Sequence, residues 1–264
     1  MIKIKAARTG ICHLCGNHTK LTFEHIPPEA AFNKHRVKLY KLLETNQQNM
    51  PWDFEGVKYI DAQKGTGGHT ICGPCNNNTG HWYGNDYASF AVNVMEIMAN
   101  NKFEPKQTVE IHTKKIFPAR ILKQVLSMFC SLNSHTFVEK FGLREYILGK
   151  HQKAIDRTKF KLSMYLSAGS LLKQIPLAAM SVGIDLESQH ILLVSELTTQ
   201  PLGFIFDASS QQAIPPGLEL NHFAEYGYDD CVDLVLRIPI FETNTGFPTD
   251  YRSKDEIIKQ ASIS

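Results

Sequence analysis

Two stretches of the chain place apolar residues at the spacing of an α-helix. In residues 78–100 an apolar side chain recurs every three to four positions, and this stripe predicts a helix with one buried face. The stripe consists of Tyr83, Tyr87, Phe90, Val94 and Met98. A second stripe begins after Pro118, a residue favoured at the first position of a helix, and continues to Leu132. We therefore expect two core helices, over residues 78–100 and 118–132.

Beyond residue 157 the pattern changes to that of strands. Short runs of apolar and β-branched residues alternate there with turn-forming segments. The expected strands cover residues 159–166, 175–184, 190–197, 201–207 and 231–241, and turn signals occur at residues 167–169, 198–201 and 215–217. An earlier strand is expected over residues 108–112, and the last dozen residues predict a short helix or a tail. The second half of the chain is therefore expected to be rich in β-structure.

A shorter alternating pattern occupies residues 21–28. Leu21, Phe23 and His25 alternate with other residues, and the two prolines that follow end the run. A short strand over residues 21–26 is therefore expected, with His25 close to its end.

The segment that follows this strand contains the most basic cluster of the chain. Residues 29–32 and 37–43 predict one helix, and residues 51–70 are expected to be irregular. The basic cluster comprises Lys34, His35, Arg36, Lys38 and Lys41. Two interpretations stay open for it, an exposed helix face or a surface that contacts phosphates.

Length and composition restrict the class of protein. The 264 residues can bury a core and can form one large or two modest domains. Apolar residues make up 43% of the chain and charged residues 20%, which is ordinary for a soluble globular protein. No apolar run approaches the roughly 18 residues that span a bilayer, and the first residues lack the apolar core of a signal peptide. We therefore expect a cytoplasmic protein without membrane contact, whose thiols stay reduced.

The net charge of +2 conceals an asymmetry between the two halves. Residues 1–125 contain 16 Lys and Arg against 10 Asp and Glu, an excess of six positive charges. Residues 126–264 contain 12 against 16, an excess of four negative charges. Two interpretations of the positive excess in residues 1–125 stay open: a basic face that only contacts solvent, or a surface for an anionic partner. Nucleic acid is the partner that we expect.

Four of the six cysteines form two Cys-x2-Cys pairs, which is the spacing of zinc sites. The members of the two pairs are Cys12, Cys15, Cys72 and Cys75. Four thiolates complete a tetrahedron and leave no open coordination position, so this zinc is expected to be structural. His13 and His18 lie near the first pair, but the four cysteines make them unnecessary as ligands.

The residues framed by the cysteine pairs have the chemistry for phosphodiester hydrolysis. Glu24 and His25 lie between the pairs and Asn76 follows the last cysteine, so a closed zinc site would hold all three near each other. A carboxylate and an amide oxygen suit a hard cation such as Mg²⁺. A neutral imidazole can accept a proton from the attacking water. The cation then stabilises charge on the phosphorane and on the leaving 3′ oxygen.

Three motifs in this order resemble those of the HNH endonucleases, in the version with a zinc-stapled ββα-metal finger: Cys12-x2-Cys15, Glu24-His25-Ile26-x-Pro28 and Cys72-x2-Cys75-Asn76. The resemblance covers residues 10–100. It implies His25 as general base, Glu24 and Asn76 as ligands of a catalytic Mg²⁺ or Mn²⁺, and the four cysteines as structural zinc ligands. It also implies a β-hairpin followed by a helix, which docks in the DNA minor groove beside the scissile phosphate.

The chain departs from the family pattern at three places. Glu24 stands where Asp is commoner, and residues 30–68 are an insertion whose role is open. An Asn that often precedes the second cysteine pair and pins the loop is absent. His69 is the nearest polar residue, and we expect it to pin the loop; a substrate contact or simple exposure are the alternatives.

Four further residues have reactive side chains but weaker patterns. His81 and Asp86 lie on the predicted helix and are candidates for the active site, although a solvated helix face is the preferred interpretation. Cys130 lies among apolar residues and is expected to be a buried small hydrophobe. Cys231 has acidic neighbours, which disfavour a reactive thiolate.

The sequence therefore predicts an α+β protein with an N-terminal HNH nuclease domain, over residues 1–104, and a β-rich α+β domain over residues 105–264. The expected function is a metal-dependent endonuclease, with DNA as the favoured substrate. The alternative is a non-catalytic zinc-finger module that binds nucleic acid or protein. The second domain is expected to supply specificity, formation of a homo-oligomer or regulation by a partner. Regulation rests on an analogy of domain layout with phage-defence and toxin systems.

Overall fold

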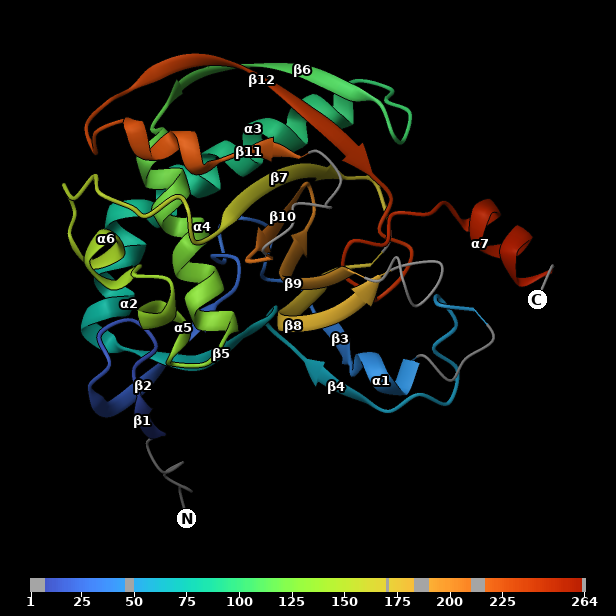
Figure 1. The fold of residues 1–264 in the computed structure, drawn as a ribbon, viewed down its shortest axis with the longest axis horizontal. Helices are drawn as coiled ribbons and strands as arrows, with labels where there is room; N and C mark the ends of the chain where they lie inside the picture. The colour runs from blue at the N-terminus through green and yellow to red at the C-terminus, as the bar shows by residue number, and fades with distance from the viewer. Residues whose placement is uncertain (1–7, 46–49, 170, 183–189, 210–216, 263–264) are drawn as a thin grey trace.

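The chain folds as a mixed α+β protein, as the sequence predicts (Figure 1). The computed structural model describes residues 8–45, 50–169, 171–182, 190–209 and 217–262. The described strands form a three-stranded sheet in the order β1-β2-β5, a two-stranded β3-β4 hairpin and a seven-stranded sheet. The large sheet has the order β6-β12-β7-β10-β9-β8, and β11 pairs with β7.

The N-terminal sheet and its hairpin use short strands. The sheet consists of β1 (Thr9–Ile11), β2 (His18–His25) and β5 (Gly67–Cys72), all antiparallel. Between β2 and β5 the chain forms β3 (Val37–Tyr40), α1 (Leu42–Thr45) and β4 (Tyr59–Ala62). The strand predicted over residues 21–26 is therefore confirmed as part of β2.

The large sheet confirms the predicted change to β-structure. Its strands are β6 (Thr108–Ile116), β7 (Lys161–Ser167), β8 (Lys173–Val182), β9 (His190–Thr199), β10 (Leu202–Asp207), β11 (Leu218–Glu219) and β12 (Val232–Phe241). Neighbouring strands are antiparallel apart from β12 and β7, which are parallel. Each strand predicted from the sequence overlaps one of these. The predicted ends at residues 183–184 and the turn at 215–216 lie outside the described residues.

The central helix is α4 (Pro118–Leu132), with the bounds that the sequence predicts. All of its residues except Arg120 and Leu132 are buried, so the helix is covered on every side rather than on one face. It contacts α3, β5 and β8. A helix in this position is surrounded by core, which explains why its polar residues are buried as well.

Lys123 shows how α4 accommodates a buried charge. Its Nζ donates to the carbonyl oxygens of Gly149 and Lys150, at 2.6 and 3.1 Å, beyond the end of α6 (Arg144–Leu148). It also lies 4.5 Å from the centroid of the Tyr146 ring. Because burial disfavours the charged form, it lowers the pKa of Lys123 to about 8.

The other predicted helix is longer at its start than the sequence indicates. It begins as α2 (Gly73–Thr79), continues through a π-helical segment (Gly80–Gly84) and ends as α3 (Asn85–Asn100). Most of the predicted apolar stripe is buried, and Met98 is partly buried. The hydroxyl of Tyr228 donates to the carbonyl oxygen of Trp82 at 3.2 Å, within the π-helical segment. A π-helical segment can leave a backbone carbonyl oxygen without a donor from the helix, and here the Tyr228 hydroxyl is the donor for Trp82.

The prediction of one helix over residues 29–32 and 37–43 is wrong. Residues 29–32 form turns, and Phe32 has a φ of 66°, which a continuous helix excludes. Residues 37–40 are strand β3, which pairs with β4 from Val37 opposite Ala62 to Tyr40 opposite Tyr59. Only α1 is helical. The predicted irregular segment over residues 51–70 likewise contains β4 and most of β5.

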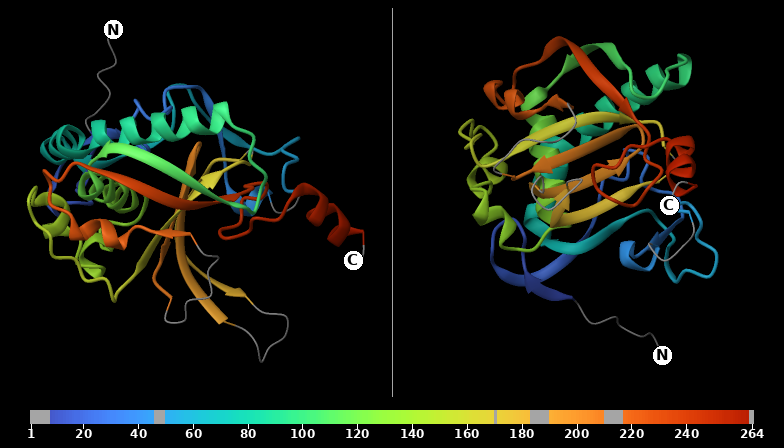
Figure 2. Two further views of the ribbon diagram at one scale, coloured as in Figure 1. Left: turned by 90° about the horizontal axis from the view of Figure 1, so that it is seen from above. Right: turned by 45° about the vertical axis from the view of Figure 1, so that its right-hand side comes forward.

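One face of the large sheet packs against α3 and α4 (Figure 2). Tyr87 of α3 contacts Phe204 of β10, with ring centroids 6.2 Å apart, and Phe129 of α4 contacts Phe206 at 5.6 Å. On the opposite face Tyr165 of β7 lies 5.1 Å from Tyr251, which belongs to the segment before α7 (Lys254–Ala261). The C-terminal segment thus covers the second face of the sheet, and the predicted terminal helix is confirmed.

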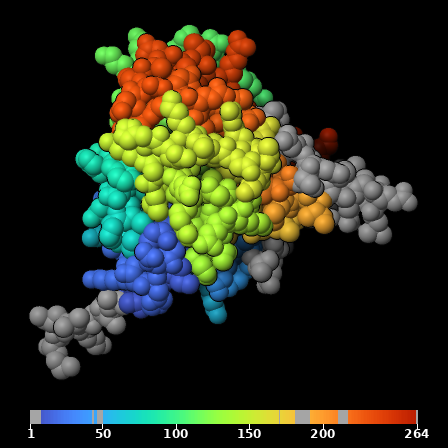
Figure 3. All heavy atoms as spheres, turned by 60° about the vertical axis from the view of Figure 1, so that its left-hand side comes forward, coloured from blue at the N-terminus to red at the C-terminus, as the bar shows by residue number. Residues whose placement is uncertain are grey.

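The apolar core is continuous across the boundary predicted after residue 104. A single cluster of buried residues runs from Cys12 and Leu14 to Ile240 and includes apolar residues of the central helix from Ile121 to Cys130. The side chain of Arg144 donates to the carbonyl oxygen of Leu14 at 3.0 Å, and His13 contacts the carbonyl oxygen of Cys130 at 3.1 Å. In Figure 3 the yellow-green segment that includes α5 (Phe137–Lys140) lies directly against the blue N-terminal segment. The division into two domains, over residues 1–104 and 105–264, stays a prediction.

Within the described residues, none of the helices combines the length and the apolar content needed to cross a lipid bilayer.

Candidate metal centre and the adjoining strand end

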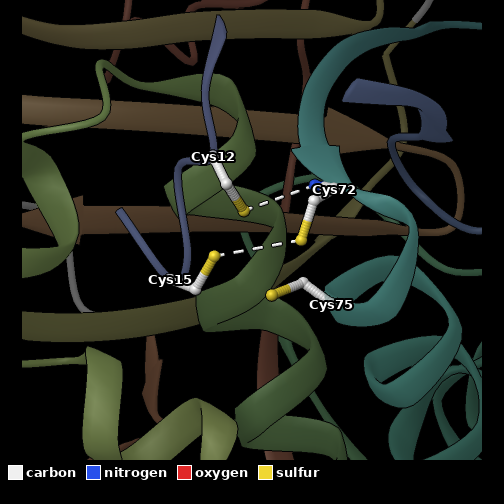
Figure 4. Close-up of side chains that lie close together, drawn as sticks. All are labelled: Cys12, Cys15, Cys72 and Cys75. Carbon is white, nitrogen blue, oxygen red and sulfur yellow. Dashed lines mark hydrogen bonds between the residues drawn. The ribbon is translucent and has the colours of Figure 1, made fainter. Parts of the chain in front are cut away.

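The four cysteines of the two pairs meet at one point. Their sulfur atoms all lie within 4.8 Å of one another, and Figure 4 shows the four side chains converging from two segments. The residues are Cys12, Cys15, Cys72 and Cys75. Cys15 Sγ and Cys72 Sγ are 3.9 Å apart. Four sulfurs around a zinc ion at about 2.3 Å are separated by about 3.8 Å, so the cluster has the dimensions of a zinc site.

Two tight local structures hold the cysteines in place. Gly16 has a φ of +77°, and its amide donates to the carbonyl oxygen of Cys12 at 2.9 Å, which closes the first turn. Cys72 ends β5 and Cys75 lies in the first turn of α2, with Pro74 between them. The amide of Cys72 donates to Cys12 Sγ at 3.3 Å. The predicted clustering of the two pairs is therefore confirmed.

The charge state of the cluster favours a cation. Contact with the Cys75 thiol and several backbone amides lowers the pKa of Cys12 to about 4. The same contact, together with burial, raises the pKa of Cys75. The pocket therefore holds one thiolate readily, whereas four thiolates need the compensating charge of a metal ion. All-sulfur ligands without an open position fit zinc in a structural role.

The two histidines near the first pair lie outside this cluster. His13 is directed to the carbonyl oxygen of Cys130, and His18 is exposed on β2. Among the described residues, the four cysteines are the one group of three or more His, Cys, Asp or Glu side chains that lies close enough to hold a metal ion.

The cysteine cluster joins the start of α2 to an antiparallel strand pair. β2 pairs with β5 so that Glu24 lies opposite Gly68 and His25 opposite Gly67. A Cβ atom on Gly67 would lie 2.0 Å from the carbonyl oxygen of Glu24, so glycine is required at this position. Because α2 follows β5 without a loop, two antiparallel strands and a helix form one unit beside the cysteines.

His25 is the last residue of β2 and is partly exposed. Its Nδ1 atom is buried and has no hydrogen-bond partner among the described residues. The ring lies edge-on to Phe23, with centroids 5.0 Å apart, and Phe23 is 43% exposed. The imidazole ring thus has an aromatic neighbour, and its Nδ1 atom has no hydrogen-bond partner within the described structure.

Asn76 is tied to the strand that carries His25. Its Nδ2 atom donates to Thr22 Oγ1 at 3.1 Å and to the carbonyl oxygen of Phe23 at 3.0 Å. No hydrogen bond among the described residues uses the amide oxygen, which leaves this atom for a ligand. The structure therefore attaches Asn76 to β2, the strand that also contains Glu24 and His25.

Glu24 lies on the opposite side of the strand and points into the core. It is only 5% exposed, and its Oε2 atom accepts a hydrogen bond from the hydroxyl of Ser131 in α4. Burial raises the pKa of Glu24 to about 8, although the Ser131 hydroxyl partly offsets the effect. The carboxyl group is therefore mostly neutral at pH 7.

Of the two predicted ligands of a catalytic divalent cation, one fits this role and the other does not. The free amide oxygen of Asn76 is a suitable ligand for such a cation. Glu24 as placed does not fit, because its carboxyl group is buried, mostly neutral and bonded to Ser131. A hard cation prefers ionised and accessible oxygen atoms.

Sequence reasoning missed the residue that holds the loop after His25. Asn33 is buried and its Nδ2 atom donates to the carbonyl oxygens of Pro27 and Thr66, at 2.6 and 2.8 Å. Its Oδ1 atom accepts from the amide of Thr66 at 2.7 Å. The Gln174 side chain of β8 also donates to Thr66 Oγ1 at 2.7 Å. The sequence shows an asparagine eight positions after the strand. Its role becomes visible only in the structure, where Thr66, far along the chain, lies next to it.

The remaining candidate residues have other surroundings. His69 lies across from Phe23 at 5.4 Å between ring centroids and contacts Arg8 at 3.5 Å, and its role in pinning the loop stays a prediction. Asp86 pairs with Arg120 at 3.1 Å, and His81 is exposed. Cys130 is fully buried, as predicted, and Cys231 is exposed.

Comparison with known proteins adds no further assignment. A scan against protein-family models and searches of curated proteins and of solved structures found no match to the chain.

Proposed function

We propose that the protein is a metal-dependent endonuclease of the HNH type, which hydrolyses phosphodiester bonds with His25 as general base. DNA is the favoured substrate. The observation that carries the proposal is the pair of hydrogen bonds from Asn76 to Thr22 and Phe23. Through them the start of α2, the end of β2 and the cysteine cluster form one unit. The succession of two antiparallel strands and a helix supports the motif resemblance.

His25 has the features of a general base. It ends a strand and is partly exposed. Because its Nδ1 atom is buried, we assign the proton transfer to the other ring nitrogen, Nε2. A neutral imidazole in this position accepts the proton of a water molecule as that water attacks phosphorus. The edge-on contact with Phe23 orients the ring relative to the strand.

The metals of the proposal have different support. Zinc in the cysteine cluster is structural and holds the turn after β1 against the start of α2. A catalytic Mg²⁺ or Mn²⁺ supplies stabilisation of the charge that develops on phosphate oxygens. Asn76 is the described side chain that fits it, whereas Glu24 as placed supports β2 through Ser131. We therefore assign the proton transfer to His25 and no step to Glu24.

The burial of Glu24 favours a second candidate, a non-catalytic zinc module that binds nucleic acid or protein. In that case Glu24 and His25 only support the structure of the finger, and the protein catalyses no hydrolysis. The basic excess of residues 1–125 supports a nucleic-acid partner under both candidates. Residues 105–264 then supply specificity, assembly into a homo-oligomer or regulation by a partner, and the reduced thiols of the cluster suit a cytoplasmic location.

A cleavage panel separates the two candidates. The full chain is incubated with single-stranded, duplex and branched DNA and with RNA, with and without Mg²⁺ or Mn²⁺. The nuclease proposal predicts cation-dependent cleavage that His25→Ala abolishes and His81→Ala, at an exposed helix position, retains. Zinc content and thermal melting establish that both variants are folded. Tight binding without cleavage of any substrate would make the zinc module the better account.

A further inference from the structure

The insertion between β2 and β5 forms a hairpin whose base adjoins His25. Its two strands, β3 and β4, stand away from β1 and β2 in Figure 1. The base is closed by the bonds between Asn33 and Thr66 and by the amide of Gly65, which donates to the carbonyl oxygen of His35 at 2.9 Å. Thr66 directly precedes Gly67, the residue opposite His25. The hairpin is therefore anchored at the end of the strand that carries the proposed base.

One face of the hairpin presents a row of aromatic rings. Tyr40 lies opposite Tyr59 and Lys38 opposite Asp61, so these four side chains share a face. Tyr40 stacks on Phe54 with centroids 4.4 Å apart and lies 5.7 Å from Tyr59. Tyr59 is 48% exposed. The rings form a platform that the rest of the described chain leaves open at Tyr59.

The cations of this face lie where the platform ends. Lys38 Nζ is 4.5 Å from the centroid of the Tyr59 ring, and Arg36 makes a two-bond contact with Asp61. Both cations lower the pKa of Asp61, with the bond from Arg36 as the largest cause. The one acidic group on the strands is thereby neutralised. Over residues 34–64 there are six Lys and Arg against four Asp and Glu, two of which flank Phe54.

An aromatic platform edged by cations matches an unpaired nucleic-acid strand. Bases stack on exposed rings without regard to sequence, while lysine and arginine contact the phosphates between them. A duplex hides the faces of its bases, so it gains only the contribution of the phosphates.

We propose that the aromatic face of the β3–β4 hairpin, with Tyr59 at its exposed end, binds an unpaired nucleic-acid strand and presents it to His25. The inference rests on the proposed nuclease function and deepens it, because it names single-stranded or locally unpaired nucleic acid as the substrate class. Tyr59 and Tyr40 provide stacking, and Lys38 contacts the backbone of the strand.

The hairpin supplies its own matched control. Ile60 is adjacent to Tyr59 in β4, is 66% exposed and lies on the opposite face, opposite Leu39. Tyr59→Ala and Ile60→Ala therefore remove exposed side chains of the same strand from different faces. Tyr59→Phe keeps the ring and removes only the hydroxyl group.

The test measures binding and cleavage separately. Binding of a labelled single strand and of its duplex is measured by fluorescence anisotropy at fixed salt, in the full chain carrying His25→Ala. We expect preference for the single strand, a Kd raised roughly 5- to 100-fold by Tyr59→Ala, and little change with Tyr59→Phe or Ile60→Ala. Equal binding of strand and duplex, or equal effects of Tyr59→Ala and Ile60→Ala, would overturn the inference.

Cleavage by the chain with His25 intact distinguishes this failure from failure of the nuclease proposal. Strand binding that depends on Tyr59 without any cation-dependent cleavage rejects the nuclease and retains the hairpin as a binding surface. Cleavage that Tyr59→Ala leaves unchanged on every substrate rejects the hairpin inference and retains the nuclease.

Discussion

The carboxyl group of Glu24 accepts a hydrogen bond from the hydroxyl of Ser131, 107 positions further along the chain. Glu24 belongs to β2 and Ser131 to the central helix α4, so this bond attaches the strand of the proposed active site to the middle of the core. The carboxyl group lies below the surface, since Glu24 is almost fully buried. The bond makes the position of His25 depend on the packing of α4.

This relationship predicts different effects for two changes at Glu24. Glu24→Gln preserves the size of the side chain and its bond with Ser131, so stability and the cation concentration that supports cleavage should change little. Glu24→Ala leaves a cavity and an unpartnered hydroxyl, and should lower the free energy of unfolding by about 2–4 kcal/mol. Denaturant unfolding and cleavage across a Mg²⁺ series measure both effects.

One result would reverse the assignment of Glu24. If Glu24→Gln kept its stability but needed at least tenfold more cation for cleavage, Glu24 would be a ligand of the cation, as the motif resemblance implies. The carboxyl group would then have to leave Ser131 when the cation binds.

The sequence predicts those features of the fold that depend on local periodicity. The stripe at Tyr83, Tyr87 and Phe90 and the start of α4 at Pro118 follow from neighbouring residues, and the structure has both. The β3–β4 hairpin does not follow from local periodicity. β3 is only four residues long, and Asp61, which lies opposite Lys38, belongs to a strand across a loop. Short periodic runs are ambiguous until their long-range partners are known.

The candidate site shows the same division. The spacing of the cysteines is a local signal, and the four sulfur atoms do meet. The direction of Glu24 depends on Ser131, and the role of Asn33 depends on Thr66. Both contacts join residues that are far apart in the chain, so no pattern near either residue reveals them.

Zinc is expected at about one ion per chain in protein purified without chelator, since four sulfur ligands complete its coordination. Cys75→Ser should remove the zinc and lower the stability, because the cluster clamps the turn after β1 to α2. Cys231→Ser is the matched control, as Cys231 is exposed and outside the cluster. Metal analysis and thermal melting of the three proteins check the prediction, which fails if Cys75→Ser retains a full zinc complement.

Lys123 predicts a pH dependence of stability. Burial lowers its pKa from 10.5 to about 8 in the folded chain. Between these values the unfolded chain binds the proton and the folded chain does not, so the contribution of Lys123 to stability is present above pH 10.5 and lost as the pH falls through 8. The change amounts to roughly 3 kcal/mol across the window.

The measurement compares wild type with Lys123→Met by denaturant unfolding at pH 7.5 and at about pH 10. The difference in unfolding free energy between the two proteins should move in favour of wild type at the higher pH, because other titrating groups cancel. Lys102→Met, at an exposed position, should show no such movement. A difference that stays constant for Lys123→Met would contradict the lowered pKa.

Asn76 separates support of the strand from binding of a cation. Asn76→Ala removes the hydrogen bonds to Thr22 and Phe23, and should lower the free energy of unfolding by about 1–3 kcal/mol and cleavage by at least tenfold. Asn77→Ala, at the exposed neighbouring position, should do neither.

Asn76→Asp retains an oxygen for a cation and loses the donor that holds β2. If the amide oxygen binds the cation, Asn76→Asp should recover part of the cleavage at high Mg²⁺, while its stability remains close to that of Asn76→Ala. If Asn76 acts only through its hydrogen bonds, both variants should fail equally at every Mg²⁺ concentration, and the cation would need other ligands.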